Sequence, residues 1–182
     1  MTKASFLRPV LAAAILLLAS LQNAAAASSE TLGTDVAIAL PAIAGGITLT
    51  KDDWKGAAQL TVDTIATVGI AYGLKHVIRE QRPDKSDFQS MPSDTAALAF
   101  APANFLWDRY GWQYGVPAYA AATFVAWSRV DAKQHHWYDV TASAALAFGV
   151  SKIFTTSYHP RGLSYGVAPT DGGAYASLDY RF

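Results

Sequence analysis

The residue types that do acid–base and anion chemistry are concentrated in one twelve-residue segment, SRVDAKQHHWYD, from Ser128 to Asp139. Within it, His135 and Asp139 are four residues apart, so on a helix both side chains lie on one face. A carboxylate beside an imidazole fixes the tautomer of the ring and stabilises its cation. The spacing therefore predicts a nucleophilic or basic histidine. Because the polar run breaks a helical pattern before His135, we expect His135 at a helix N-terminus, where backbone N–H groups attract anions.

A second group of cations lies near the end of a predicted long helix. Lys75 and Arg82 are two helical turns apart, and Arg79 is one turn from Lys75. Three cations on one side of a helix end form either an anion site or a solvated face. Taken alone, the solvated face is the simpler interpretation, because cations commonly decorate helix C-termini.

Helical patterns surround both groups and would have to position them. Asp52 or Asp53 begins the long helix, Ser93 or Asp94 can cap a later one, and Pro83 lies in the polar loop between these two helices. We expect an all-α bundle of about five to six helices. The apolar segments that predict it are 34–50 (interrupted near Pro41), 51–80, 93–111, 113–129 and 136–154.

The composition limits the compartment and the partners. Residues 1–27 combine Lys3 and Arg8, an apolar run and small residues, the three parts of a secretory signal peptide, with cleavage expected after about Ala27. Removing them leaves twelve basic and fourteen acidic residues, a net charge of −2, which provides no basic field for nucleic acid. The 182-residue chain has no cysteine, so thiol chemistry and disulfides are excluded. We expect an exported, periplasmic protein of one domain.

Two further expectations concern the surface and the C-terminus. Charged residues interrupt most apolar runs, which favours a compact periplasmic bundle with an apolar face touching the membrane over a fully inserted one. Near the C-terminus, apolar and polar residues alternate from Ala174 to Phe182 after a TDGG turn. This pattern predicts a β-hairpin that caps the helical domain.

Considered together, the motifs resemble a known family. The sequence KHVIREQRP has a lysine, six residues and Arg-Pro; PSDT follows, and SRVDAKQHHWYD has Ser-Arg, five residues, His, three residues and Asp. This combination is similar to the type 2 phosphatidic acid phosphatase (PAP2) superfamily, which shares a helical-bundle fold with bacterial acid phosphatases and vanadium haloperoxidases. The resemblance spans roughly residues 51–154.

The resemblance implies a role for each motif residue. His135 would attack phosphorus and form a phosphohistidine, and Asp139 would orient it; the family needs no metal or other cofactor. The residues that would hold the phosphate oxygens are Lys75, Arg82, Arg129 and Ser93.

The middle motif departs from the family pattern. Pro-Ser-Gly-His-Thr is usual, and its histidine protonates the leaving alkoxide, whereas this chain has Pro92, Ser93, Asp94 and Thr95. Losing a general acid typically costs about 10²–10⁴-fold in rate. Asp94 is one candidate replacement, and His136 or His76 is another, although each would point away from its motif neighbour on a helix.

The sequence therefore predicts three segments: a signal peptide (1–27), a PAP2-like helical phosphatase domain (28–160) and a C-terminal β-hairpin (161–182). The predicted function is metal-independent hydrolysis of a phosphate monoester or pyrophosphate through a phosphohistidine at His135, with a phosphorylated lipid as the expected substrate class. Two alternatives remain. One is an impaired relative that binds phosphorylated ligands in the periplasm without cleaving them, and the weaker one is a haloperoxidase.

Overall fold

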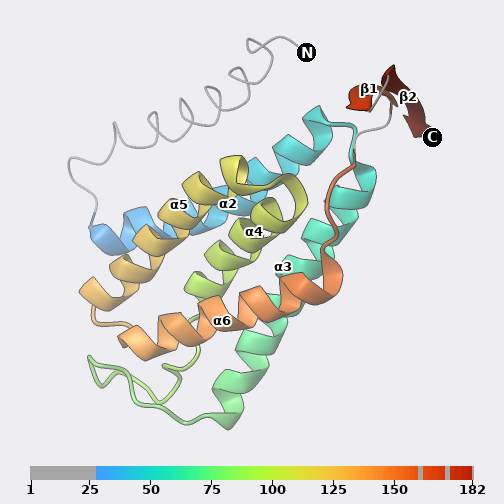
Figure 1. Ribbon diagram of the computed structural model, residues 1–182. Helices are drawn as coiled ribbons and strands as arrows, with labels where there is room; N and C mark the ends of the chain where they lie inside the picture. The colour runs from blue at the N-terminus through green and yellow to red at the C-terminus, as the bar shows by residue number, and fades with distance from the viewer. Residues whose placement is uncertain (1–27, 160–161, 171–172, 182) are drawn as a thin grey trace.

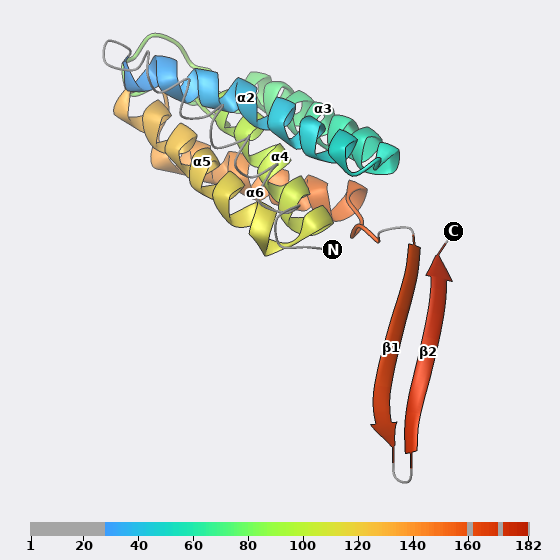
Figure 2. The ribbon, with the colours of Figure 1, turned by 90° about the horizontal axis from the view of Figure 1, so that it is seen from above.

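The computed structural model describes residues 28–159, 162–170 and 173–181, so the predicted signal peptide lies outside the described residues. Five helices form a bundle, and two strands follow them (Figures 1 and 2). The fold is therefore all-α, as predicted. The elements are α2 (Ser29–Thr50), α3 (Trp54–Val77), α4 (Asp94–Tyr110), α5 (Trp112–Asp131), α6 (Trp137–Phe154), β1 (Gly162–Thr170) and β2 (Gly173–Arg181).

The central helix is α4, which packs against all four other helices. Its sequence is rich in alanine, and an unbroken run from Ala99 to Leu106 is buried. Small side chains let the surrounding helices approach closely, and larger ones such as Phe105 and Val125 fill the remaining core. Because α4 reaches both ends of the bundle, it contributes residues to the surfaces at both ends.

Local capping chemistry sets several helix starts. The Asp53 side chain accepts a hydrogen bond from the Gly56 N–H at 2.9 Å and begins α3, and Ser93 accepts one from Ala96 N–H at 3.3 Å and begins α4. Both starts agree with the sequence. Gly111 ends α4 with φ of 89°, a left-handed conformation that suits glycine.

Three expectations about element boundaries and placement were wrong. Helix α2 continues through Pro41 instead of breaking there, and α3 ends at Val77, so Arg79 and Arg82 lie in the following loop rather than on the helix. The β-hairpin forms with Thr170 paired to Gly173. However, it extends away from the helices instead of capping them (Figure 2).

Candidate active site

One end of the bundle, at the lower left of Figure 1, brings the predicted site residues together. It contains the C-terminal ends of α3 and α5, the N-terminal ends of α2, α4 and α6, and the loop 78–93. That loop folds back on itself, with a bridge between Glu80 and Gln89, and Asp84 N–H donates to the Lys133 carbonyl at 3.2 Å. Segments far apart in sequence are thereby fixed around His135.

His135 lies just before α6, because His136 is the N-cap residue of that helix. The ring is 4% exposed, and its Nδ1 lies 2.7 Å from the backbone carbonyl oxygen of Ser90. A carbonyl only accepts hydrogen bonds, so Nδ1 carries a proton, and in the neutral ring the lone pair is on Nε2. A neutral imidazole with a free Nε2 lone pair is the form needed for nucleophilic attack.

Asp139 supports His135 less directly than its spacing predicts. Its Oδ2 lies 3.7 Å from His135 Nδ1, beyond hydrogen-bond distance, while the Ser90 hydroxyl and the His136 backbone N–H both donate to this oxygen. Burial alone would raise the pKa of Asp139, but the interaction with His135 and these hydrogen bonds outweigh burial and lower the pKa. Asp139 is therefore a buried carboxylate that can stabilise positive charge on His135.

Ser90 connects the two residues, since its carbonyl accepts from His135 and its hydroxyl donates to Asp139. A second serine, Ser143, donates to the Ser93 carbonyl at 2.8 Å and is also 3.0 Å from the Asp139 carbonyl. Neither serine is marked by a motif in the sequence as part of the site. Their contacts include backbone carbonyls of residues far apart in the sequence, which only the fold brings together. A local sequence motif does not predict such contacts.

Arg129 is a buried cation of the group. It is 6% exposed, and its guanidinium donates to the Glu30 carbonyl and lies 3.8 Å from the Glu30 carboxylate. Its Nε is buried and has no hydrogen-bond partner among the described residues. Burial and the nearby positive charge of Arg82 lower the pKa of Arg129, although Glu30 opposes them. An anion binding between Arg82 and Arg129 would relieve this repulsion.

Ser128, the other residue of the Ser-Arg motif, has a packing role. Its hydroxyl donates to the Val125 carbonyl at 2.7 Å, and the side chain is fully buried against Gly33 of α2. A Cβ added at Gly33 would lie 1.8 Å from Ser128 Oγ. The glycine therefore allows α2 to approach α5 closely enough for Glu30 to reach Arg129.

Arg82 is held over the turn that precedes His135. Its Nε donates to Asp87 at 2.8 Å, and its NH1 donates to the Gln134 side chain, also at 2.8 Å. The Gln134 and His135 backbone N–H groups in turn donate to the Arg129 carbonyl, at 3.0 and 3.2 Å. The two arginines thus lie on either side of the turn that carries His135.

Lys75 and Asp94 form an ion pair of 2.5 Å, with Lys75 only 6% exposed. The adjacent Ser93 is fully buried and caps α4, so its hydroxyl oxygen is already used as an acceptor. The Asp94 carboxylate therefore partly neutralises the positive charge of the Lys75 ammonium group. A phosphate group would have to compete with Asp94 for the ammonium group.

The other two candidate replacement acids have different surroundings. His136 Nδ1 lies 3.3 Å from Asp139, and its ring stacks on Tyr138 at a centroid distance of 4.7 Å. The exposed His76 is bound to the Tyr72 carbonyl at 2.8 Å. Of the three candidates, Asp94 directly contacts Lys75, which is predicted to bind the phosphate.

This end of the bundle therefore combines a buried imidazole, a buried carboxylate and three cations. All seven predicted site residues are in or beside one network of contacts. Such a set can bind a phosphate dianion and place a nitrogen nucleophile next to it. Gln134, Glu30, Ser90 and Ser143 complete the network.

Comparisons with known proteins agree with these features. The family model described as the PAP2 superfamily matches residues 56–163. A lipid A 4'-phosphatase from Helicobacter pylori (strain J99 / ATCC 700824) is 35% identical over 143 residues, covering 72% of each chain. No solved structure matches the chain significantly. The family match includes more than half of the chain, and the chain belongs to the PAP2 superfamily.

Proposed function

We propose that the protein is a metal-independent phosphatase that hydrolyses a phosphate monoester or pyrophosphate of a lipid through a phosphohistidine at His135. The observation that carries the proposal is the hydrogen bond from His135 Nδ1–H to the Ser90 carbonyl. In the neutral ring it leaves the lone pair on Nε2, and contacts with Arg82 and Arg129 hold the turn that carries His135. Membership of a phosphatase superfamily supports the same chemistry.

The reaction has two displacements at phosphorus. In the first, Nε2 forms a P–N bond as the bond between phosphorus and the leaving oxygen breaks, and the imidazolium charge is stabilised by Asp139. In the second, a water oxygen attacks phosphorus, the P–N bond breaks, and inorganic phosphate leaves with neutral histidine restored. Lys75, Arg82 and Arg129 stabilise the negative charge on the phosphoryl oxygens in both steps.

Asp94 is the proposed proton carrier. A phosphate dianion that binds Lys75 displaces the Asp94 carboxylate from its ion pair. The freed carboxylate then takes up a proton from water, and the resulting carboxyl group delivers it to the leaving alkoxide. In the second step the resulting carboxylate accepts a proton from the attacking water. Substrates whose leaving group departs without a proton, such as a pyrophosphate, depend less on Asp94.

The surface of the bundle supports a lipid substrate. Large apolar side chains are exposed at both ends and between them, including Trp137, Tyr138 and Trp127 near His135. Among the described helices, α2 alone has the length and hydropathy to cross a membrane. We propose that these apolar side chains contact a lipid bilayer at the periplasmic side, so that a phosphorylated head group reaches His135 from the membrane.

The similarity to a lipid A 4'-phosphatase makes a lipid-linked sugar phosphate the first substrate to test. We expect the purified full chain, with a metal chelator present, to release phosphate from lipid A, from a dialkyl phosphatidate and from p-nitrophenyl phosphate. His135→Ala should abolish all release. His76→Ala is the matched control, because its ring is exposed and bound only to Tyr72, and it should retain activity.

The leaving groups separate the nucleophile from the proton carrier. The aryl group of p-nitrophenyl phosphate departs without protonation, whereas an alkoxide does not. Asp94→Asn should therefore reduce release from phosphatidate by about 10²-fold or more and reduce release from the aryl ester less, because the aryl ester needs Asp94 only in the second displacement. Equal losses on both substrates would contradict the role of Asp94.

The second candidate function is reversible binding of phosphorylated ligands without hydrolysis. The observation that favours it is the ion pair between Lys75 and Asp94, the residue that follows Ser93 in a middle motif without the usual histidine. Phosphate-ester binding that depends on Arg129, without His135-dependent release from any of the three substrates, would support this function and overturn the first.

A further inference from the structure

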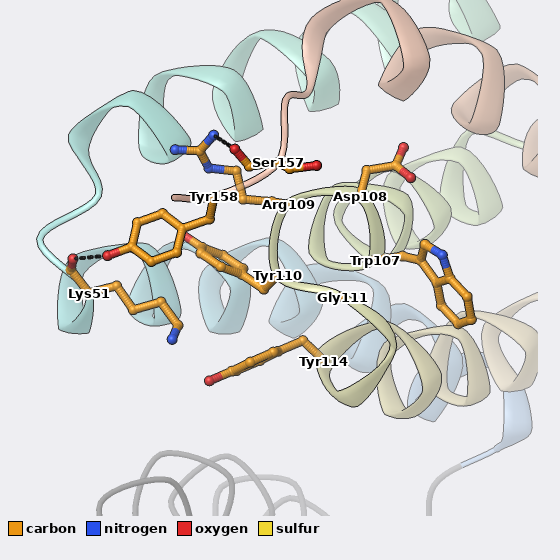
Figure 3. Close-up of a pocket in the computed structure, with 9 residues that line it drawn as sticks. All are labelled: Lys51, Trp107, Asp108, Arg109, Tyr110, Gly111, Tyr114, Ser157 and Tyr158. Atoms are coloured by element: carbon orange, nitrogen blue, oxygen red, sulfur yellow. Dashed lines mark hydrogen bonds between the residues drawn. The ribbon is translucent and has the colours of Figure 1, made fainter. Parts of the chain in front are cut away.

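A cavity lies at the opposite end of the bundle from His135. Its volume is about 380 Å³, and its lining comes from the α2–α3 connection, the end of α4, the start of α5 and the segment after α6 (Figure 3). Helix α4 has Asp94 at one end and Tyr110 at the other. Its 17 residues correspond to about 25 Å at 1.5 Å per residue. The cavity is therefore separate from the candidate site residues around His135, which we call the catalytic cluster.

The charged side chains around this cavity are neutralised, with one exception. Arg109 forms two hydrogen bonds with the Asp53 carboxylate, at 2.5 and 2.7 Å, and Tyr110 donates to the same carboxylate at 2.7 Å. Asp108 is paired with Lys152 at 2.5 Å. These contacts leave no net charge on either pair.

The exception is Lys51. Its Nζ lies over three tyrosine rings, 5.3 Å from the centroid of Tyr110, 5.0 Å from Tyr114 and 5.7 Å from Tyr158. The backbone is held as well, since the Tyr158 hydroxyl donates to the Lys51 carbonyl at 3.2 Å (Figure 3). No carboxylate lies within ion-pair distance of Lys51 in the described part of the chain. One positive charge is therefore positioned at the cavity without an anion.

The remaining features indicate what kind of anion would fit. Four of the nine residues that line the cavity are aromatic, and aromatic rings suit carbon-bearing groups next to a charge. Trp54 and Trp112, at the first residues of α3 and α5, are 73% and 63% exposed, and tryptophan is enriched where proteins meet lipid head groups. In addition, no side chain caps the first turn of α5, which begins at this cavity.

We propose that this cavity binds the phosphate head group of an anionic lipid, with Lys51 as the charge partner and the tyrosine rings against the head-group carbons. The site is independent of His135 chemistry. It would fix the end of the bundle remote from the catalytic cluster to a lipid of matching charge.

Native mass spectrometry of the detergent-solubilised full chain tests the proposal by counting retained lipids. We expect a phosphatidylglycerol molecule to be retained in preference to phosphatidylcholine. Lys51→Gln should weaken this retention by about fivefold, and Lys51→Arg should keep it. Lys55→Gln, which removes an exposed lysine in the first turn of α3, is the matched control and should bind as the unchanged protein does.

Two further arms exclude other sources of binding. In the Arg129→Gln background, where phosphate binding at the catalytic cluster is impaired, Lys51-dependent retention should persist. This arm distinguishes failure of the site from failure of the proposed phosphatase activity. Inorganic phosphate should not displace the lipid at equal concentration, and displacement would identify free phosphate as the ligand and overturn the lipid proposal.

The lipid selectivity of the unchanged protein also tests the proposal, so the test does not depend on whether a Lys51 variant folds. Equal retention of phosphatidylglycerol and phosphatidylcholine would overturn it without any substitution. For variants with the circular dichroism spectrum of the unchanged protein, equal retention with Lys51→Gln and Lys55→Gln would also overturn it.

Discussion

At the scale of single residues, Ser90 has two functions because it uses its backbone and its side chain on different partners. The carbonyl accepts from His135, which sets the tautomer, and the hydroxyl donates to Asp139. A substitution to alanine removes only the second contact. Ser90 is therefore a positioning residue whose two contributions can be separated experimentally.

We expect Ser90→Ala to reduce kcat by about tenfold and to leave KM nearly unchanged. A hydrogen bond to a charged group contributes about 1.5–3 kcal/mol, and its loss leaves Asp139 less well held against the imidazolium. Steady-state kinetics with p-nitrophenyl phosphate measure the effect. Ser86→Ala, in the same loop but exposed, should be neutral, and a change confined to KM would contradict the positioning role.

Asp139 gives the residue-scale prediction for pH. Its folded pKa is lowered below that of an unfolded aspartate, so its stabilising contribution is present above about pH 4 and is lost as pH falls through the folded pKa. We expect Asp139→Asn to be less stable than the unchanged protein at pH 7, with the difference narrowing below about pH 4. Thermal unfolding from pH 3 to 7 measures this. Asp35 is exposed, so Asp35→Asn should have the same thermal stability as the unchanged protein at each pH. A stability difference for Asp139→Asn that does not change with pH would contradict the prediction.

At the scale of helices, Gly33 determines how closely α2 packs on α5 beside Arg129. We expect Gly33→Ala to lower the free energy of unfolding by about 1–3 kcal/mol, because the new methyl group would overlap Ser128. Activity should fall as well, since Glu30 would move away from Arg129. Chemical denaturation and kinetics measure both effects.

The same helix offers a matched control. Gly45 has no atom within 4 Å of an added Cβ, so Gly45→Ala should be neutral or stabilising by up to about 1 kcal/mol. Equal destabilisation by both substitutions would show that α2 tolerates alanine poorly everywhere. That result would contradict a specific contact at Gly33.

Comparison of the helices shows which features a sequence can predict. The starts of α3 and α4 were predicted correctly, because Asp53 and Ser93 cap them through contacts within three residues. The end of α3 was not, because the loop after Val77 is shaped by pairing with Gln89 and by Lys133. Pro41 was misleading for a related reason: packing against neighbouring helices keeps α2 continuous despite a local helix breaker.

The site shows the same division. The spacing of His135 and Asp139 identified both residues, but it predicted a direct contact within one helix. The structure places His135 before the helix and inserts Ser90 as the hydrogen-bond partner. Ser90 comes from a loop 45 residues earlier, and such long-range contacts have no signature in a single sequence.

At the scale of the whole molecule, the two ends of the bundle have different electrostatic character. The His135 end contains three cations, whereas the opposite end has one lysine among tyrosines with no carboxylate partner in the described part of the chain. Exposed apolar side chains lie at both ends and between them. The proposed arrangement in contact with lipid would therefore present a phosphate-binding group at each end of α4.

The β-hairpin gives the last prediction, which concerns the domain boundary expected near residue 160. A two-stranded hairpin is marginally stable by itself, and this one extends away from the helices (Figure 2). By contrast, Tyr158 N–H donates to the Arg109 carbonyl at 2.8 Å, so the segment before the hairpin belongs to the helical domain.

Truncation after His159 should therefore preserve both phosphatase activity and thermal stability. A loss of 1 kcal/mol would shift the Tm of a domain of this size by about 2–4 °C, so we expect a shift below about 2 °C. Truncation after Ser157, which also removes Tyr158 and its contacts with Arg109 and Lys51, should lower the Tm measurably. If the two truncations were equally destabilised, the hairpin would be part of the cooperative unit, and the boundary would lie elsewhere.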